Sequence, residues 1–589
     1  MRTLNAFLTL TFALLIIIMA AQPCDPDGRG IRLTSQNDVD QFNVRYPNCD
    51  VIQGDLKIGY PVENLRGLSQ IKRIEGSLLV RDWSWLNRRN QDLSSLEGLN
   101  NLEYVGGNLY IDSIENLITL EGLSSLEVVK GDVYLANNQS LEYLDGMSKL
   151  DSIIGKLTIR GHPSLRNLLH LNTINHMLGD IEVSSNALIN NLSGFENLRR
   201  VNGNMVIRSN ASLDSLKGLE RLEAIDQDLV ITDNPDLGIM GRLVNNYEMG
   251  PVNLISIGEE LKIINNDALQ TMSGLNGLKR VGDRFDIKNN ESLHDLSNLQ
   301  SLNELNGILA IDNNPSLLNL NGFNNLNEIG GLGIGNNSSL FSLYGIHNIR
   351  IVHGDFGIGG QQPGLEIISG GELPDGSGVH RFLEVDSILG SLYISGYAHS
   401  LLGFYQLDYI GGDLSFTRNI KLSGFFSPFT NLKRIDGVLS FDYNYELSEI
   451  HFPNLQYIGG VNFSNNDKLS VCQFNNLKTI GEQGMRIRGN NLLSSFAYSV
   501  PVLEEILGDV ELYDTEVRDF TGFENLKLID GHFTFDLNWN LFSLNGLNNL
   551  EYINGNLIMK NSRSLIGMNM HELQAINGVL NVGGNRSIT

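Results

Sequence analysis

The stretch Gly131-Asp-Val-Tyr-Leu-Ala-Asn-Asn138 is one copy of a motif, G-x-L-x-I-x-x-N, that recurs about every 24 residues from Gly54 to Asn585. Another clear copy is Gly203-Asn-Met-Val-Ile-Arg-Ser-Asn210. Self-similarity at this period is typical of a solenoid, in which one short unit coils and stacks on the next. The repeat therefore predicts a solenoid before any residue-level chemistry is considered.

Each unit combines a strand pattern with a corner. Apolar residues alternate with polar ones, as at Leu109 and Ile111, which predicts a short strand with one inward face. The glycine before the strand predicts a corner where a side chain would clash or φ must be positive. A second phrase, L-x-x-L-x-G-L-x-x-L-x-x-I, runs between copies, as from Leu141 to Ile153. We count 22 units, which predicts an all-β parallel β-helix of about 22 coils.

The spacing of the units also predicts the domain organisation. The period lengthens at three places, near 81–92, 238–252 and 361–383, where we expect insertions. The expected segments are a signal peptide (1–21), an N-terminal cap (22–53), solenoid (54–237), an insertion (238–258), solenoid (259–360), an insertion (361–383) and solenoid to the end (384–589).

The N-terminus has the features of a secretory signal. Arg2 precedes an apolar run from Phe7 to Ala21, which is short for a membrane span. No later stretch is apolar enough to cross a membrane, so we expect a secreted or cell-surface chain without a transmembrane segment. Cys24 lies near the cleavage region and leaves a bacterial lipoprotein as an alternative, although Pro23 fits that processing poorly.

The three cysteines divide into a pair and a single residue. Cys24 and Cys49 flank one segment near the mature N-terminus, and an oxidising compartment favours a disulfide between them. Cys472 occupies a position where other coils carry leucine, as at Leu144, so we expect a buried small hydrophobe rather than a nucleophile.

The two ends of the solenoid differ. Residues 30–48 predict a strand followed by a short helix capped at Ser35 or Asn37, which would cover the first coil. No matching cap follows Asn585, and an open parallel edge invites pairing. We therefore expect a partner or a missing domain at the C-terminal edge.

Asparagine holds the eighth motif position in 14 of the 22 units. Asn tolerates left-handed turns, and its amide can bond the backbone of the next coil, so we expect a stacked, inward-facing Asn ladder. Several ladder positions are also N-x-S/T sequons: Asn138, Asn210, Asn290, Asn337 and Asn585; two further sequons, Asn191 and Asn462, lie off the ladder.

The repeat phrase and its cap resemble a known family. The likeness is carried by Leu33 to Phe42, by Tyr46-Pro-Asn-Cys49 and by Val51-Ile-Gln-Gly-Asp-Leu-Lys-Ile58. These segments resemble the receptor L domain, the right-handed, leucine-rich β-helical module of insulin and epidermal growth factor receptors, in the multi-copy form found in secreted bacterial proteins. The resemblance implies a right-handed coil. The receptors' cysteine-rich modules, membrane helix and kinase are missing here, so growth-factor signalling is not implied.

Catalytic chemistry finds little support in the repeat. The residues that follow the motif glycine form a row with alternating charge, which we interpret as relief of like-charge stacking. The row includes Asp132, Lys156, Asp180, Asn204 and Asp228. Motifs for zinc, calcium, phosphate and redox sites are absent from the sequence, so we expect no catalytic residue, metal or cofactor. His162 and His532 hold slots otherwise occupied by Asn or Asp, which we interpret as ordinary surface or turn positions.

Recognition is expected instead in the insertions, because loops on a rigid scaffold often carry function. The first insertion contains Trp83, Trp85, Arg88 and Arg89, residue types favoured at binding hot spots. The net charge of −25 disfavours nucleic acid as a partner. We expect a non-enzymatic recognition or adhesion protein that binds a glycan or a protein. The alternative is a carbohydrate-active β-helical enzyme, a polysaccharide lyase or hydrolase.

Overall fold

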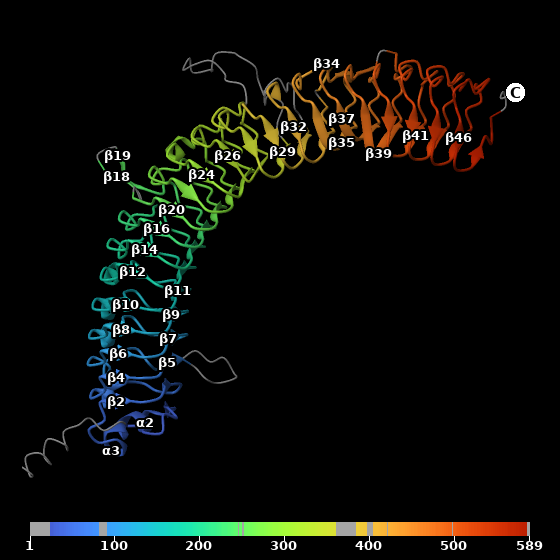
Figure 1. Ribbon diagram of the computed structural model, residues 1–589. Coiled ribbons are helices and arrows are strands. Elements are labelled where there is room, and N and C mark those ends of the chain that lie inside the picture. The colour runs from blue at the N-terminus through green and yellow to red at the C-terminus, as the bar shows by residue number, and fades with distance from the viewer. Residues whose placement is uncertain are drawn as a thin grey trace, which may run out of the picture. The chain divides into compact units, whose positions relative to one another are not determined.

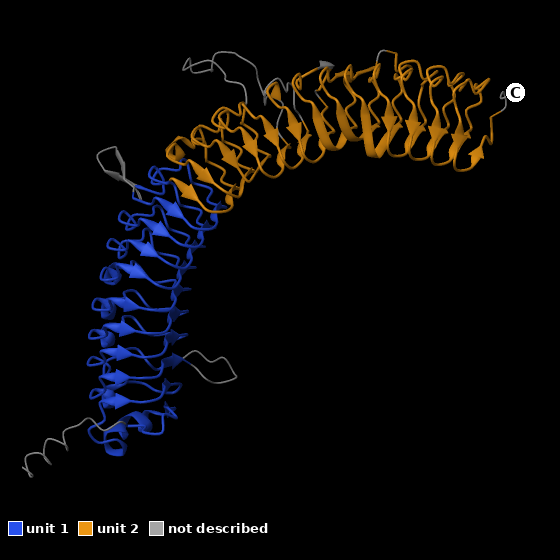
Figure 2. Ribbon diagram, in the orientation of Figure 1, with its two compact units in different colours: residues 1–278 blue, residues 279–589 orange. Residues whose placement is uncertain are grey.

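The structure is a computed structural model that describes residues 24–81, 91–244, 247–249, 253–360, 384–396, 404–420, 422–497 and 499–585. The chain forms two compact units, residues 1–278 and 279–589 (Figure 2). Each unit is a stack of parallel coils, and the chain makes about 21 turns of about 24 residues with almost no helix (Figure 1). The predicted all-β parallel solenoid is therefore confirmed.

In the first unit, one strand per coil pairs in parallel with the strand of the next coil. These strands are β1 (Ile31–Leu33), β3 (Leu56–Ile58), β5 (Leu78–Arg81), β7 (Leu109–Asp112), β9 (Val133–Ala136), β11 (Leu157–Arg160), β13 (Ile181–Ser184), β15 (Met205–Arg208), β17 (Leu229–Thr232) and β21 (Leu261–Ile264). Two-residue strands line a second side of the coils: β2 (Val51–Ile52), β4 (Arg73–Ile74), β6 (Tyr104–Val105), β8 (Val128–Val129), β10 (Ser152–Ile153), β12 (His176–Met177), β14 (Arg200–Val201), β16 (Ala224–Ile225) and β20 (Ser256–Ile257). The antiparallel pair β18 (Arg242–Val244) and β19 (Tyr247–Met249) lies within the second predicted insertion.

The second unit repeats this plan with longer strands near its middle. Its main strands are β23 (Phe285–Lys288), β25 (Ile308–Asp312), β27 (Gly331–Gly335), β29 (Phe356–Gly359), β31 (Leu392–Ser395), β33 (Leu414–Thr417), β35 (Arg434–Asp442), β37 (Tyr457–Ser464), β39 (Thr479–Arg488), β41 (Val510–Tyr513), β43 (Phe533–Asp536), β45 (Leu557–Lys560) and β47 (Leu580–Asn581). Shorter strands are β22 (Arg280–Val281), β24 (Glu304–Leu305), β26 (Glu328–Ile329), β28 (Ile351–Val352), β30 (Ser387–Ile388), β32 (Tyr409–Ile410), β34 (Gly424–Phe426), β36 (Leu447–His451), β38 (Val471–Gln473), β40 (Glu505–Ile506), β42 (Leu528–Ile529), β44 (Tyr552–Ile553) and β46 (Ala575–Ile576).

Helical structure in the described chain is confined to short pieces. The predicted strand and short helix are present: β1 leads into α2 (Gln36–Asp40), whose first turn is closed by the Ser35 side chain accepting from the Asp38 N–H. The remaining pieces are α3 (Phe42–Arg45) and the 3₁₀ turns η1 (Arg66–Leu68), η2 (Glu121–Leu123), η3 (Asp145–Met147), η4 (Leu169–Leu171) and η5 (Ser297–Leu299).

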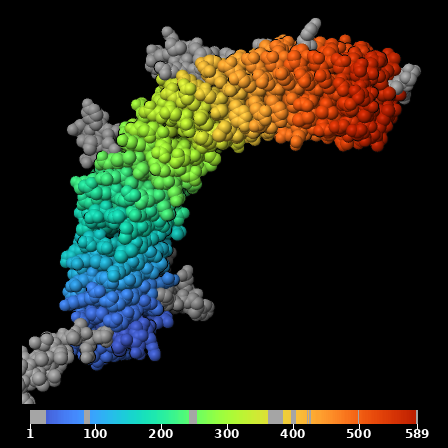
Figure 3. All heavy atoms as spheres, viewed as in Figure 1, coloured from blue at the N-terminus to red at the C-terminus, as the bar shows by residue number. Residues whose placement is uncertain are grey.

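The interior of each unit is filled by the buried inward positions of the repeat, so neither unit is a hollow tube. Figure 3 shows one face of the surface that surrounds them. Leu109 and Ile111 on β7 are fully buried, as the alternation predicts. In the second unit, phenylalanines replace leucine at one inward position of four successive coils. Phe404, Phe429, Phe452 and Phe474 stack with ring centroids 5.6 to 5.7 Å apart.

The motif glycines are required by close packing between coils. A Cβ built on Gly437 would lie 2.3 Å from Asp413 Oδ1 and 2.5 Å from the Gly412 carbonyl carbon. Positive φ is instead found at the seventh motif position, for example 53° at Asn137 and 54° at Asn313. Leucine occupies this left-handed position once, at Leu537, with φ of 58°.

We predict that Gly437→Ala destabilises the second unit by about 1–3 kcal/mol, because a methyl group forced into this contact displaces the neighbouring coil. The matched control is Gly333→Ala on β27, where a Cβ meets no atom within 4 Å. That change should leave stability unchanged or raise it by about 0.5–1 kcal/mol. Thermal unfolding followed by circular dichroism measures both, and equal behaviour of the two variants would contradict the packing explanation.

Candidate recognition surface

The sequence-predicted contact residues Trp83, Trp85, Arg88 and Arg89 lie outside the described residues. The third predicted insertion, residues 361–383, also lies outside them. Strand β5 ends at Arg81, the last described residue before the first of these segments. The role of the Trp and Arg residues therefore stays a prediction.

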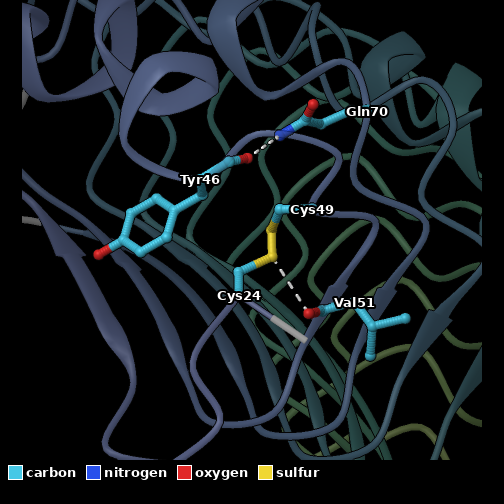
Figure 4. The surroundings of a disulfide bond; sticks show 5 residues. All are labelled: Cys24, Tyr46, Cys49, Val51 and Gln70. Atoms are coloured by element: carbon cyan, nitrogen blue, oxygen red, sulfur yellow. Dashed lines mark hydrogen bonds between the residues drawn. A yellow bond between two sulfur atoms is a disulfide. The ribbon is translucent and has the colours of Figure 1, made fainter. Parts of the chain in front are cut away.

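The cysteines lie as predicted. Cys24 and Cys49 form a disulfide with a Cα–Cα distance of 5.2 Å beside the cap (Figure 4). The Cys24 N–H donates to the Val51 carbonyl, and Gln70 donates to the Tyr46 carbonyl at 3.0 Å, which ties the cap to the first coils. Cys472 is buried, and burial raises the pKa of its thiol to about 12, so the thiolate form that nucleophilic chemistry needs is disfavoured.

The asparagine ladder is confirmed, and it holds successive coils together. The Asn210 amide donates to the Val183 carbonyl at 3.0 Å, and its Oδ1 accepts the Asn186 backbone N–H at 3.1 Å. Asn186 makes the equivalent bonds one coil earlier, to Ile159 and to the N–H of His162. The ladder sequons with no exposed surface are Asn138, Asn210, Asn290 and Asn337. Their side chains are buried and cannot accept a glycan in this fold.

His162 corrects a sequence-based interpretation, because it is neither a surface nor an ordinary turn residue. Its side chain has no exposed surface and substitutes for asparagine in the ladder. Nδ1 accepts the Asn138 N–H at 3.3 Å and Nε2 lies 3.0 Å from the Leu135 carbonyl, which is the pattern of a neutral ring. Burial outweighs the hydrogen bonds and lowers the pKa of His162 to about 4.

The row that follows the motif glycine forms a second ladder. Asp132 Oδ1 accepts the Lys156 N–H at 2.8 Å, and Asp180 Oδ1 accepts the Asn204 N–H at the same distance. His532 belongs to this row too, since its Nδ1 accepts the Asn556 N–H at 2.9 Å. The row is structural, as predicted, and its Asp132, Asp180 and His532 side chains accept backbone N–H bonds from the next coil.

These two ladders leave the outward strand positions free to carry chemistry. In the first unit, the tilted rings of Tyr110 and Tyr134 lie with their centroids 4.9 Å apart, and Glu182 lies between Lys156 and Arg208. Desolvation raises the pKa of Glu182, but hydrogen bonds from Lys156, Arg208 and Ser184 together outweigh it and bring the pKa down to about 2. Glu182 is therefore an ionised, paired residue and is poorly suited to act as a general base.

In the second unit, a groove of about 330 Å³ gathers titratable residues from β39 and β41 and from the positions just before β41 and β43. Its titratable lining comprises Glu482, Arg486, Asp509, Glu511 and His532. Two of the carboxylates are already engaged: Glu511 pairs with both Arg486 and Arg488, and Asp509 accepts the His532 N–H at 2.6 Å.

A second hollow of the same unit, about 560 Å³, lies over β27 and β29. Its floor includes Gly333, Gly335, Gly357 and Gly359, which occupy the outward strand positions. Its margins include Lys288, Asp312, Asn336, Tyr393 and Ser395. Sequence reasoning missed this site because glycine is so frequent in the chain; the available signal was glycine at alternate positions within two strands.

Among the described residues, no cluster of three or more His, Cys, Asp or Glu side chains is arranged to hold a metal ion. Nor does the part of the chain that the structure describes contain a helix long and apolar enough to cross a membrane.

Comparison with known proteins gives one family match. Residues 48–151 match the family model described as receptor L domain, which agrees with the resemblance drawn from the cap and first repeats. Among solved structures, the chain is similar to the protein in the crystal structure of the TLR13-ssRNA13 complex, at 14% identity and a TM-score of 0.25, covering 89% of this chain and 88% of that chain. No protein with a curated description matches the chain.

The buried ring of His162 makes a testable prediction about pH. Because its folded pKa of about 4 lies below the ordinary value, the unfolded chain binds a proton first as the pH falls. The stabilisation is complete above about pH 6.5, declines as the pH falls toward 4, and differs by about 2 kcal/mol between pH 7 and pH 5. Urea unfolding at the two pH values measures it.

The matched variant is His162→Asn, which places the usual ladder residue between Asn138 and Asn186. It should fold, and the part of the pH dependence that belongs to His162 should disappear. An identical loss of stability at pH 5 in both proteins would show that His162 is not the titrating group.

Proposed function

We propose that this chain is a secreted or cell-surface recognition protein, acting in adhesion or ligand capture, that binds a glycan or a protein without chemical turnover. The observation that carries the proposal is that the repeat's recurring polar residues form hydrogen bonds between coils. The side chains of Asn210 and Asp132 bond the backbone of an adjacent coil, which leaves the outward strand positions to face a partner. A long, rigid and repetitive face of this kind is typical of binding solenoids.

Two further observations support this proposal. The receptor L domain match covers the first coils, residues 48–151, and the Cys24–Cys49 disulfide is a bond that persists in oxidising, extracytoplasmic compartments. The charge of −25 disfavours polyanionic partners such as nucleic acid, because phosphate binding requires clustered Lys and Arg.

The outward faces and the first insertion supply the candidate contacts. Trp83 and Trp85 carry large aromatic surfaces, and Arg88 and Arg89 add the donors of guanidinium groups, a combination that is enriched at hot spots. We propose this loop as one contact and the outer face of the second unit as another.

A carbohydrate-active enzyme is the second candidate, and the charged groove favours it. Glu482, Asp509, Glu511 and His532 line this one groove, and glycoside chemistry requires at least two carboxylates. Asp509 and Glu511 are each held in structural bonds, and His532 Nδ1 accepts the Asn556 N–H. Proton transfer in this groove would therefore use Glu482 and the Nε2 atom of His532.

A panel of soluble polysaccharides separates the two candidates. We expect the protein to be retarded in gels that contain its ligand, with no new reducing ends and no unsaturated products. Turnover that is lost in both Glu482→Gln and His532→Asn would establish the enzyme instead.

The loop has its own test. Trp83→Ala and Trp85→Ala should weaken retention or protein-array binding by about tenfold or more, since each removes a hot-spot side chain. The control is Trp539→Ala, which removes a 41% exposed Trp stacked with Arg563 in the second unit. Equal loss in loop and control variants would contradict a specific role for the loop.

A further inference from the structure

The glycines of β27 and β29 form a patch without side chains on the outer face of the second unit. In the parallel register, Ala310 pairs with Gly333, Gly333 with Gly357, and Gly357 with Tyr393. On neighbouring strands the equivalent outward positions hold side chains such as Asp286 and Ser415. This row of outward side chains is therefore interrupted at two successive coils, at Gly333 and Gly357, and the interruption creates the hollow.

Coil packing does not require these glycines. A Cβ on Gly333 would meet no atom within 4 Å, and one on Gly357 would meet only the Leu332 carbonyl oxygen at 3.9 Å. Neither residue has positive φ. Glycine within a strand costs roughly 0.5–1 kcal/mol relative to alanine, and it often marks close approach of a ligand or another backbone. The fold gains nothing from Gly333 or Gly357, so a role in close approach explains them better.

The margins of the hollow define what can lie in it. Tyr393 is 43% exposed and follows the glycines in the same register row, so an apolar ring face borders the floor. Polar groups complete the border: the Asp312 carboxylate accepts from the Asn336 amide at 3.0 Å, and Ser395 lies beside Gly359. A carboxylate accepts several hydrogen bonds, so Asp312 can serve a ligand as well as Asn336.

The charges of the hollow are balanced, which bears on the ligand. Lys288 is paired with Asp286 at 3.0 Å, and Asp312 is bonded to a neutral amide. No ionic ligand is favoured by such a lining. A flat, uncharged ring with an apolar face and a rim of hydroxyl groups fits the glycine floor, the Tyr393 face and the polar margin together.

We propose that this glycine-floored hollow is a subsite for one neutral hexopyranose ring of a glycan. The inference rests on the proposed recognition function and names the ligand class for one of its surfaces. The ring lies against the peptide planes of β27 and β29, with one edge against Tyr393 and its hydroxyl groups bonded to Asp312, Asn336 and Ser395.

The test fills the hollow without disturbing the coils. The double variant Gly333→Thr/Gly357→Thr places two strand-forming side chains on the floor, where the structure has open space. Thermal stability should be equal to or above that of the wild type, and affinity should fall at least tenfold. Titration calorimetry with neutral hexasaccharides of glucose, mannose and N-acetylglucosamine provides the readout. The control is Ser440→Thr on β35, an outward position away from the hollow, which should change neither quantity.

Tyr393 gives an independent readout of the stacked ring. Tyr393→Phe keeps the aromatic face and should retain most of the affinity, whereas Tyr393→Ala should lose about tenfold. Absence of hexasaccharide binding by the wild type would overturn the subsite. Unchanged glycan binding by the filled variant would overturn it as well, but would leave the recognition function intact. If a protein ligand from an array is lost on filling while no glycan binds, the hollow is a protein contact and the proposal is wrong.

Discussion

The hydrogen bond from an asparagine side chain to the backbone of the preceding coil is the interaction on which the rest of the structure depends. Strand pairing provides backbone hydrogen bonds for only a few residues per coil. Without the asparagine side chains, backbone N–H and C=O groups at the buried corners would lack partners, at a cost of about 1–3 kcal/mol each. Asn186 and Asn210 fill this role in consecutive coils, and His162 does so with an imidazole. The acceptors after the motif glycines, such as Asp132, provide a second set of coil-to-coil bonds.

This arrangement explains which parts of the fold could be predicted from sequence. The repeated Gly, Leu and Asn positions follow from close packing, burial and backbone hydrogen bonding, respectively. The coils, the Asn ladder and the Ser35 helix cap were therefore predictable. The bonding role of Asp132 was not predictable. The repeat period shows which residues occupy equivalent positions in successive coils, but it does not show which neighbours they bond. His162 looked like a surface residue for the same reason. The role of Gly333 was not predicted either, because only the structure shows that no clash between coils requires a glycine there.

The candidate site could be predicted only in part. Reasoning from residue type pointed to Trp83 and Trp85, whose role stays a prediction, and it overlooked both hollows of the second unit. Those hollows depend on which side chains neighbour one another across coils, as Tyr393 and Gly357 do. Such neighbours are about 24 residues or more apart and become apparent only when the register is known. The second unit thus has two different depressions. One is a charged groove whose carboxylates are mostly paired, and the other is a neutral hollow whose floor is formed by glycines.

The repeat's asparagines hold the backbone of neighbouring coils, so their side chains are not available to a ligand. Hydrogen exchange of the Asn186 amide, compared between the wild type and Asn210→Ala, measures this role. The Asn186 N–H donates to Asn210 Oδ1 at 3.1 Å. Loss of that buried acceptor should speed exchange by about 10- to 100-fold. Equal protection of this amide in the two proteins would contradict the account.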